Sequence, residues 1–555
     1  MTTFTQKGSP LVVSTTLDPD LLLATGIAGR EELNLGFEFT VNLVAKKGSP
    51  IPFDKILGQP MGLRFQRPCK DNSFPERLFH GVVFEFRKHS QDQVFDHYSA
   101  IIRPRLHLLG LTKRSRVFQD IGAREILTGL LSTVGGGDFR VFGDLRHRKY
   151  CVQYQETDLE FFRRICGEEG LSFFWIHEKH DHPLVITNRT SLAQSLGKVE
   201  FNATLGGPPT HPVITEWTLA QRLTASGVEV NDTHFQLFGS PLEGASRIPQ
   251  KIDVGTKTHE LDLTGRFTRE DTQSSIRDQD GVTPSGGSDP QAFSRVYEQL
   301  EQGARQGSRG LASQAIRANG EGLCPHLLPG YAFELAGQGE QNGGWLVVAM
   351  EHQVRMEGAY WAGEEIRLEA RHQIEASPVA LDQAPWPPAP KPKVGGVLTA
   401  TVTGPEGRET FVDEYGRVQL RFHWEIDDST QSATSCWVRV SQSWAGKGYG
   451  TFFWPRIGNE VVVAFENGDP DRPIVVGSLY NSQTGTPLEL PALALVQGLR
   501  TRLKGSAPGQ MAHSLVFSDD PSEPIVHLKS NTMFLVHQKR EQQNSSPDTQ
   551  FNIRG

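Results

Sequence analysis

The sequence predicts a mainly β protein with a minor helical part, in which β-rich units are followed by a small OB-like barrel. Two patterns support this class. Residues 418–424 alternate apolar and polar side chains, as a strand with one buried face requires. Residues 461–465 form an apolar run that ends at residues 467–470, where glycine and proline favour a turn. A meander of about five such strands hides its edges by closing into a barrel.

The first part of the chain, residues 1–110, shows the same alternation. Apolar side chains recur at every second position in residues 35–41, 82–86 and 98–102, and turn-rich segments separate these runs. We therefore expect an antiparallel β-domain in this part of the chain.

Residues 111–377 predict a second β-rich unit that also contains helices. Apolar residues recur at helical spacing in residues 121–132. Thr157 precedes another such segment, and Glu160 lies three positions after Thr157. This spacing is typical of a capping box. Helix formers dominate residues 292–307, and the polar segment 272–289 predicts a mobile loop. Strands are expected at residues 171–176, 253–261, 265–269, 314–319, 331–335, 345–353 and 365–373.

Residues 378–393 are dense in proline and predict a semi-rigid linker, because proline fixes φ and favours an extended chain. The OB-like barrel then occupies residues 394–481. In residues 482–555, strands are expected at 497–501, 515–517, 525–528 and 534–537, and residues 541–555 are expected to be poorly ordered.

Composition narrows the function class. The net charge of −8 and the pI near 6.2 argue against a nucleic-acid partner. The basic cluster at residues 146–149, near Arg140, is interpreted as a solvated strand end. The polar first ten residues indicate no signal peptide, and no apolar stretch is long enough for a membrane span. The five cysteines form no CxxC pair, which is typical of folding in a reducing compartment. They are Cys69, Cys151, Cys166, Cys324 and Cys436.

Three groups of residues could indicate a metal site, a phosphate-binding loop or a hydrolase site, and each also has a structural interpretation. His177, His180, Asp181 and His182 lie close together, but their spacing matches no zinc motif and favours a polar hairpin tip. The glycines of residues 135–137 lack the Lys-Ser/Thr of a P-loop and predict a chain reversal. A glycan hydrolase would need two carboxylates across a cleft, whereas the acidic cluster here matches helix ends. That cluster contains Glu156, Asp158, Glu160, Glu168 and Glu169.

An OB-like barrel can also bind single-stranded nucleic acid through exposed aromatic side chains beside Lys and Arg. Here Trp424 shares a strand face with Val418 and Leu420, which favours a place in the barrel core. Glycan hydrolysis and, less favoured, single-stranded nucleic-acid binding remain the alternative functions. We predict that no metal or cofactor is bound and that the chain is not an enzyme.

The barrel region contains a spaced set of turn and strand residues. They are Tyr415, Gly416, Arg417, Trp437, Gly448, Gly450, Pro455, Gly458, Gly468, Asp469, Pro470, Arg472, Pro473 and Gly477. With these residues the barrel region resembles the OB module of VgrG proteins, the spikes of type VI secretion systems, which are similar to the hub and spike of contractile phage tails. The same resemblance reappears at residues 154–162, 168–171 and 328–333.

The resemblance implies a structural role. It implies a homotrimer with hub-like head barrels, an OB-fold base and the start of an intertwined β-prism or β-helix stalk. The implied partners are a hexameric inner tube protein, a tip protein at the distal end and effector proteins, whose identities the sequence does not disclose. It further implies assembly in the cytoplasm and expulsion by sheath contraction into the medium or a target cell. The prism region is expected to be short.

Overall fold

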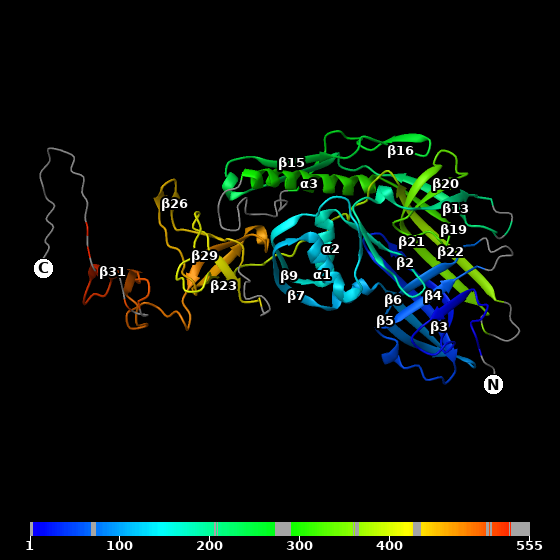
Figure 1. The fold of residues 1–555 in the computed structure, drawn as a ribbon, viewed down its shortest axis with the longest axis horizontal. Coiled ribbons are helices and arrows are strands. Elements are labelled where there is room, and N and C mark those ends of the chain that lie inside the picture. The colour runs from blue at the N-terminus through cyan, green and yellow to red at the C-terminus, as the bar shows by residue number, and fades with distance from the viewer. Residues whose placement is uncertain are drawn as a thin grey trace.

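The computed structural model describes residues 4–67, 74–204, 207, 209–271, 290–358, 360, 366–425, 435–506, 510, 513–531, 533 and 535. The molecule is elongated, with a large N-terminal head at one end (Figure 1). A small barrel built from β23 (Leu398–Thr403), β28 (Glu460–Phe465) and β29 (Pro473–Leu479) lies beyond the head, and a short sheet containing β31 (His513–Ser518) lies at the far end. Within the described residues, no helix combines the length and apolar character needed to cross a membrane.

The first half of the head sheet has the strand order β1-β4-β5-β6-β3-β2, with every neighbour antiparallel. The predicted alternation is confirmed, because Phe37, Phe39 and Val41 are buried, whereas Leu35 lies in the preceding turn and is exposed. The strands are β1 (Leu11–Ser14), β2 (Leu23–Glu32), β3 (Gly36–Lys46), β4 (Pro60–Phe65), β5 (Arg77–Gln91) and β6 (Phe95–Arg103).

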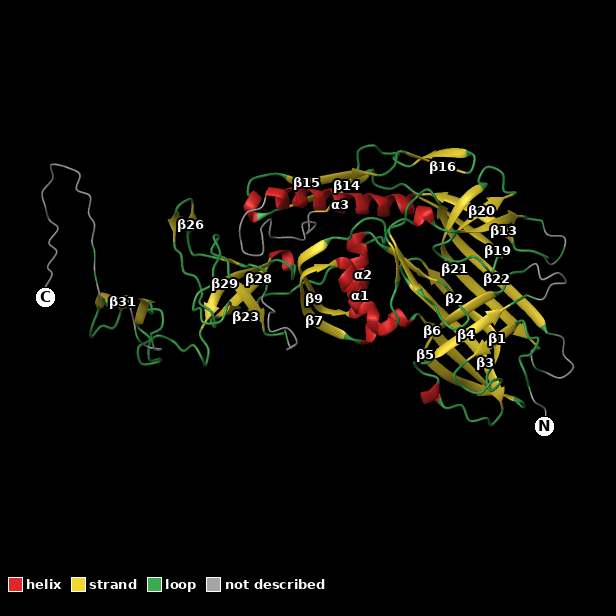
Figure 2. Ribbon diagram, viewed as in Figure 1, coloured by secondary structure: helices red, strands yellow, loops and turns green. Residues whose placement is uncertain are grey.

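The second half joins the first through the pairing of β2 with β21, so that both halves belong to one 12-stranded sheet. Because β21 also pairs with β22, the order β21-β20-β12-β13-β19-β22 closes on itself as a barrel. The mainly β class is therefore confirmed (Figure 2). These strands are β12 (Ser195–Phe201), β13 (Val213–Gln221), β19 (Ile316–Leu323), β20 (Ala332–Ala336), β21 (Gly343–Glu357) and β22 (Arg367–Pro378).

A small α/β lobe is inserted between these two halves. Its helix α2 begins with the predicted capping box: the Glu160 backbone N–H donates to Thr157 Oγ1 at 3.1 Å, and the Thr157 N–H donates to Glu160 Oε2 at 2.7 Å. The elements are β7 (Lys113–Gly122), α1 (Ala123–Leu131), β8 (Asp138–Arg140), β9 (His147–Thr157), α2 (Asp158–Glu169), β10 (Ser172–Trp175) and β11 (Leu184–Thr187).

Helix α3 (Pro290–Ala315) is longer than the predicted segment 292–307 and continues through three glycines into β19. The glycines allow close packing: a Cβ at Gly307 would lie 2.9 Å from Val228, and one at Gly310 would lie 2.5 Å from Trp386. Tertiary contacts thus outweigh the low helix propensity of glycine. The strands near α3 are β14 (Gly227–Asp232), β15 (Leu242–Arg247) and β18 (Thr268–Asp271).

Residues 253–261, predicted as one strand, instead contribute to a hairpin of β16 (Lys251–Val254) and β17 (Lys257–Glu260). The chain reverses at Gly255, where φ is +63° and a Cβ would lie 2.2 Å from the Glu340 carbonyl oxygen. The loop predicted at 272–289 lies outside the described residues. The short 3₁₀ helices are η1 (Phe53–Lys55), η2 (Arg105–Leu111), η3 (Ser132–Val134), η4 (Thr190–Leu192), η5 (Phe235–Leu237) and η6 (Glu466–Gly468).

The small barrel is a five-stranded sheet of order β24-β23-β28-β29-β25, and a bridge between Val418 and Val438 links its two ends. The predicted strand faces are confirmed, because Leu420 and Phe422 are buried while Arg421 is exposed. Its strands are β23 (Leu398–Thr403), β24 (Gln419–Phe422), β25 (Arg439–Val440), β28 (Glu460–Phe465) and β29 (Pro473–Leu479), with the hairpin β26 (Ala445–Gly446) and β27 (Tyr449–Gly450) beside them.

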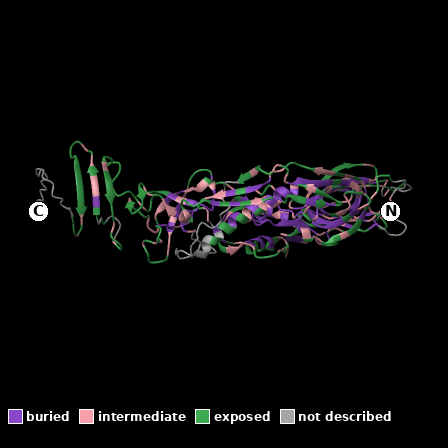
Figure 3. Cartoon of the chain, turned by 90° about the horizontal axis from the view of Figure 1, so that it is seen from above, coloured by how far each residue is buried: buried purple, intermediate pink, exposed green. Residues whose placement is uncertain are grey.

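Three antiparallel strands follow the barrel, and both faces of their sheet are largely exposed (Figure 3). Of the segment predicted as a further strand at 534–537, only Leu535 lies within the described residues. Residues 541–555 also lie outside them. The strands are β30 (Val496–Arg500), β31 (His513–Ser518) and β32 (Ile525–Ser530).

Candidate functional site at the junction of head and barrel

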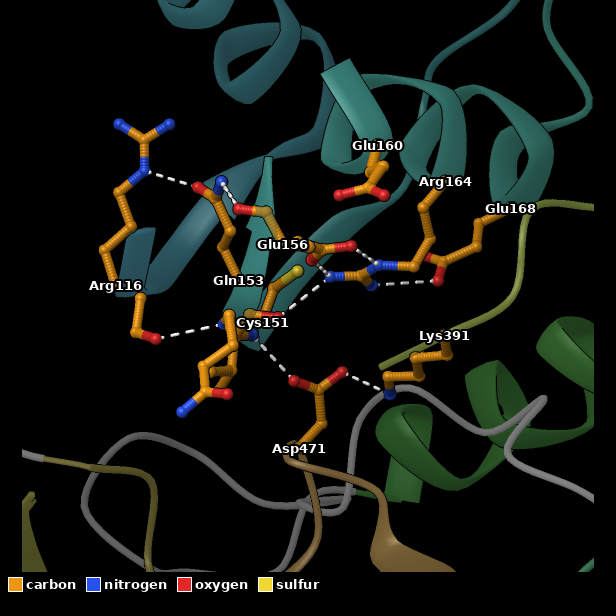
Figure 4. A network of polar contacts seen from close by, with 12 residues as sticks. Arg116, Cys151, Gln153, Glu156, Glu160, Arg164, Glu168, Lys391 and Asp471 are labelled. Carbon is orange, nitrogen blue, oxygen red and sulfur yellow. Dashed lines mark hydrogen bonds and ion pairs between the residues drawn. The ribbon is translucent and has the colours of Figure 1, made fainter. Parts of the chain in front are cut away.

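The turn between β28 and β29 fastens the small barrel to the head. Asp471, in this turn, is 5% exposed, and its Oδ1 accepts a hydrogen bond of 2.7 Å from the backbone N–H of Val152 in β9. Its Oδ2 lies 2.5 Å from Nζ of Lys391 in the linker. Figure 4 shows Asp471 pointing from the barrel ribbon toward β9 and Lys391. One carboxylate therefore joins head, linker and barrel, and we call this group of contacts the junction.

Arg472, the next residue, forms a second contact of the junction. Its Nη1 and Nη2 lie 2.7 and 2.5 Å from the two carboxylate oxygens of Asp232, at the end of β14. Both side chains are almost fully buried. Burial acts to lower the pKa of Arg472, but Asp232, together with Asp469 and Glu466, holds that pKa above its ordinary value. Such a two-pronged contact fixes orientation as well as distance.

Aromatic contacts complete the junction. The ring of Phe235, in η5 of the head, lies 5.1 Å from the guanidinium carbon of Arg417 and 5.3 Å from that of Arg439, both in the barrel. The Tyr415 ring meets Phe235 edge-on at 5.3 Å. Trp424 meets Tyr154 of β9 edge-on, with ring centroids 6.0 Å apart. The barrel is thus held through charged, aromatic and backbone contacts.

Beneath the junction, β9 and α2 share a buried ion network. Arg164 lies between two carboxylates, with Nη2 2.6 Å from Glu156 and Nη1 3.1 Å from Glu168 (Figure 4). Arg148 is 2.5 Å from Glu168 and 2.5 Å from Glu169. Burial acts to lower the pKa of Arg148, yet Glu168 and Glu169 hold it well above its ordinary value. The strand that receives Asp471 is thereby anchored to the lobe.

The interpretation of residues 146–149 as a solvated strand end is wrong for the two arginines of this segment. Arg148 is buried in the network, and Arg146 contacts Glu169 at 3.2 Å. His147 is exposed and Lys149, 2.5 Å from Asp120, is partly exposed, as expected there. The acidic partners lie on α2, some twenty positions later, so the local sequence gave no sign of burial.

Several of the fourteen predicted barrel positions lie at the junction, and others do not. Tyr415, Arg417, Asp469 and Arg472 contact the head or the linker, with Asp469 paired to Lys391. Gly468, Pro470 and Pro473 shape the same turn. The remaining positions stay within the barrel: Gly416 against Trp454, Trp437 against Phe411, Gly448 and Gly450 in the exposed β26–β27 hairpin, Pro455 and Gly458 before β28, and Gly477 in β29.

Sequence reasoning missed the head residues that receive the barrel. Asp232 and Phe235 lie in a segment with no distinctive motif, and Val152 takes part through its backbone alone. Asp471 belongs to the motif segment but was not singled out. A signal was present in the linker, because Lys391 is one of only two cations, with Lys393, in the proline tract of residues 378–393.

The histidines considered for a metal site fall into a buried hydrogen-bond network instead. His177 Nε2 lies 3.2 Å from Glu31 Oε2, and His182 Nδ1 lies 2.8 Å from His80 Nδ1. Asp181 pairs with Arg105, and His180 is exposed. In the described part of the chain, no group of three or more His, Cys, Asp or Glu is placed to hold a metal ion.

This network predicts a pH dependence of stability. Burial lowers the pKa of His80 to about 4, compared with about 6.5 in an unfolded chain. Between these values the unfolded state binds the proton and the folded state does not, so the free energy of unfolding decreases as pH falls. For His80 alone the decrease from near pH 7 to near pH 5 is about 2 kcal/mol.

The measurement is denaturant unfolding near both pH values for the wild type and His80→Asn. Because asparagine does not titrate, the variant should lose about 2 kcal/mol less on acidification. Equal losses for the two proteins would show that His80 does not stay neutral in the fold.

All five carboxylates of the acidic cluster have partners within the chain. Glu156, Glu168 and Glu169 bind arginines of the network, Asp158 pairs with Arg114 and Arg116, and Glu160 caps α2. This arrangement favours structural use over glycan hydrolysis.

Trp424 packs between Tyr154 and Phe422, which leaves it poorly placed to stack on a base.

Comparison with known proteins decides the family. Residues 30–358 match the family described as phage tail baseplate hub (GPD), and residues 409–480 match the type VI secretion system/phage-baseplate injector OB domain. The chain is 32% identical over 533 residues to the type VI secretion system spike protein VgrG1a of Pseudomonas aeruginosa, covering 94% of this chain and 77% of that protein. This chain belongs to the VgrG family. It is a spike protein of a type VI secretion system, as the sequence resemblance predicted.

Other relatives agree with this assignment. This chain is also 31% identical over 529 residues to the spike protein VgrG3 of Vibrio cholerae, and the match covers 92% of this chain and 48% of VgrG3. The E. coli c3393 protein has the same fold, with a TM-score of 0.53 and 16% identity over 84% of this chain and 99% of that chain. That protein is a type VI secretion component described as similar to the T4 tail proteins gp27 and gp5. A chain of the Francisella PdpA-VgrG complex matches with a TM-score of 0.54 and 8% identity, over 91% of this chain and 84% of that one.

Proposed function

We propose that this VgrG protein works as a homotrimer in which three heads form a hub on a hexameric inner tube and three barrels form the base of a shaft. Sheath contraction drives the trimer forward, and the junction transmits that force from head to shaft. The division into residues 1–110, 111–377, 378–393, 394–481 and 482–555 is part of this proposal.

The observation that carries the proposal is the C-terminal sheet of β30, β31 and β32. Its apolar side chains are exposed in a single chain: Leu499 is 52% exposed, Val526 is 67% and Leu528 is 56%. A three-stranded sheet with open edges and apolar side chains in water is marginally stable alone. Pairing with two further copies would cover both the edges and the side chains.

The barrel supplies a second group of exposed apolar side chains. They surround the β26–β27 hairpin, and a patch of this kind is typical of a surface that binds another chain. The group contains Trp444, Tyr449, Phe452, Phe453 and Trp454.

The remaining partners follow from the position of each part along the shaft. The head end would contact the inner tube, and the C-terminal end would lead toward a tip protein and effectors. The PdpA-VgrG complex of Francisella shows that a VgrG relative can hold a second protein. Assembly in the cytoplasm and release by contraction complete the proposal.

Light scattering on the purified chain tests the oligomeric state. We expect three times the chain mass for the wild type and a shift toward the monomer for the double variant Val526→Lys, Leu528→Lys, because buried lysines would face one another in the trimer. Ser522→Lys, in the turn before β32, should keep the trimer. A wild type that stays monomeric at all concentrations would refute the proposal.

A further inference from the structure

A cavity of about 340 Å³ lies between the head and the proline tract. Its apolar walls include Leu33, Phe173, Val348 and Trp386. This volume lies within the range of sites for small ligands, which combine apolar walls with a few placed polar groups. The charged side chains that line it are Arg163, Arg317, Glu32 and Glu375.

Arg317, at the start of β19, is the unusual member of this lining. It is 5% exposed, and within the described residues its Nε and Nη1 have no hydrogen-bond partner. Oε1 of Glu375 lies 3.9 Å from Nε, which is too far for a hydrogen bond. Burial lowers the pKa of Arg317 to about 10 although Glu375 and Glu32 act to raise it. The charge is therefore incompletely compensated.

The two carboxylates of the lining are already bound elsewhere. Arg30, which is not part of the lining, donates to Glu32 at 2.8 Å and to Glu375 at 3.2 Å. Arg163 adds a second cation whose buried Nε has no partner among the described residues, while its Nη2 donates to the Leu35 carbonyl oxygen at 3.0 Å. The cavity thus presents donors from two guanidinium groups, while both carboxylates of its lining share their charge with Arg30.

The buried arginines of the ion network differ from Arg163 and Arg317 in both their partners and the direction of their pKa shift. Arg148 and Arg164 have carboxylates at hydrogen-bond distance, and these carboxylates hold their pKa well above the ordinary value against burial. Arg163 and Arg317 have a pKa lowered by burial. Since an unpaired buried charge is costly, an anion in the cavity would offset that cost.

We propose that this cavity binds a carboxylate attached to an apolar body, with Arg317 and Arg163 holding the carboxylate and the Leu33, Phe173, Val348 and Trp386 side chains packing on the apolar part. Two sources share this chemistry: a free small carboxylic acid, and the C-terminal carboxylate of a partner chain that ends in an apolar residue.

Isothermal titration calorimetry on the full chain tests the site with four probes. These are 3-phenylpropionate, its uncharged amide, the peptide acetyl-Ala-Ala-Phe with a free carboxylate, and the same peptide amidated. We expect the acids to bind and the amides to bind at least about tenfold more weakly, because a charge-assisted hydrogen bond is lost. Stronger binding of the peptide than of the small acid assigns the site to a partner chain, and the reverse order assigns it to a free acid.

Variants separate a binding role from a structural one. Arg317→Met should lower the affinity for the acids at least about tenfold and leave the melting temperature unchanged or raised. Arg163→Met should also weaken binding. The matched control Arg148→Met should lower the melting temperature, because it leaves Glu168 and Glu169 buried without their partner. The proposal is overturned if no acid binds, if acid and amide bind equally, if Arg317→Met binds like the wild type, or if Arg317→Met destabilises the protein as Arg148→Met does.

Discussion

Glu168→Ala should lower the free energy of unfolding of the head by about 3 to 5 kcal/mol. The Glu168 side chain is 6% exposed and contacts both Arg148 and Arg164. Alanine would leave each guanidinium with fewer partners in a buried place where water cannot replace the lost oxygen atoms. The expected loss is large because the network is a unit and not a set of independent surface pairs.

Chemical denaturation measured by circular dichroism gives this value directly. Glu301→Ala is the matched control: it removes an exposed glutamate that pairs with Arg305 one turn along α3, and it should cost less than about 0.5 kcal/mol. Equal small effects for the two variants would contradict the structural role assigned to the network.

Local patterns predicted much of this fold correctly. Alternation identified the buried faces of residues 37–41 and 418–422, since one side of each strand meets a core, although Leu35 lies outside the strand and is exposed. The capping box at Thr157 and Glu160 marked the start of α2, because it satisfies backbone donors within one turn. Each of these signals depends on residues that are close in sequence.

Other features depend on contacts between distant residues. Helix α3 passes through Gly307 and Gly310 because Val228 and Trp386 leave no room for a side chain there. The barrel motif identified Arg472 but not Asp232, which lies 240 positions earlier. The unpartnered Nε and Nη1 of Arg317 likewise could not be predicted from the sequence, because the cavity that they line is formed by segments far apart in the chain.

Asp471→Ala should loosen the attachment of the barrel to the head. The Val152 N–H would lose its acceptor in a buried place, and Lys391 would keep Asp469 as its remaining carboxylate. An unpaired buried donor costs about 1 to 3 kcal/mol. Hydrogen exchange of the Val152 amide should therefore become at least about tenfold faster in the variant.

Two further variants sharpen this comparison. Asp471→Asn keeps an acceptor for the Val152 amide and should show a smaller increase in exchange. Asp520→Ala changes a partly exposed carboxylate in the turn between β31 and β32, in the distant C-terminal sheet, and should leave exchange at Val152 unchanged.

The coupling of head to barrel is tested most directly by residue-resolved hydrogen exchange at Val152, measured by mass spectrometry on the full chain. Asp471 is a barrel residue and Val152 a head residue, so this amide is protected only while the junction is closed. We predict wild-type exchange as slow as that of the β7–β9 ladder, with acceleration in Asp471→Ala. Wild-type exchange as fast as in exposed loops, or no change in Asp471→Ala, would contradict a rigid junction.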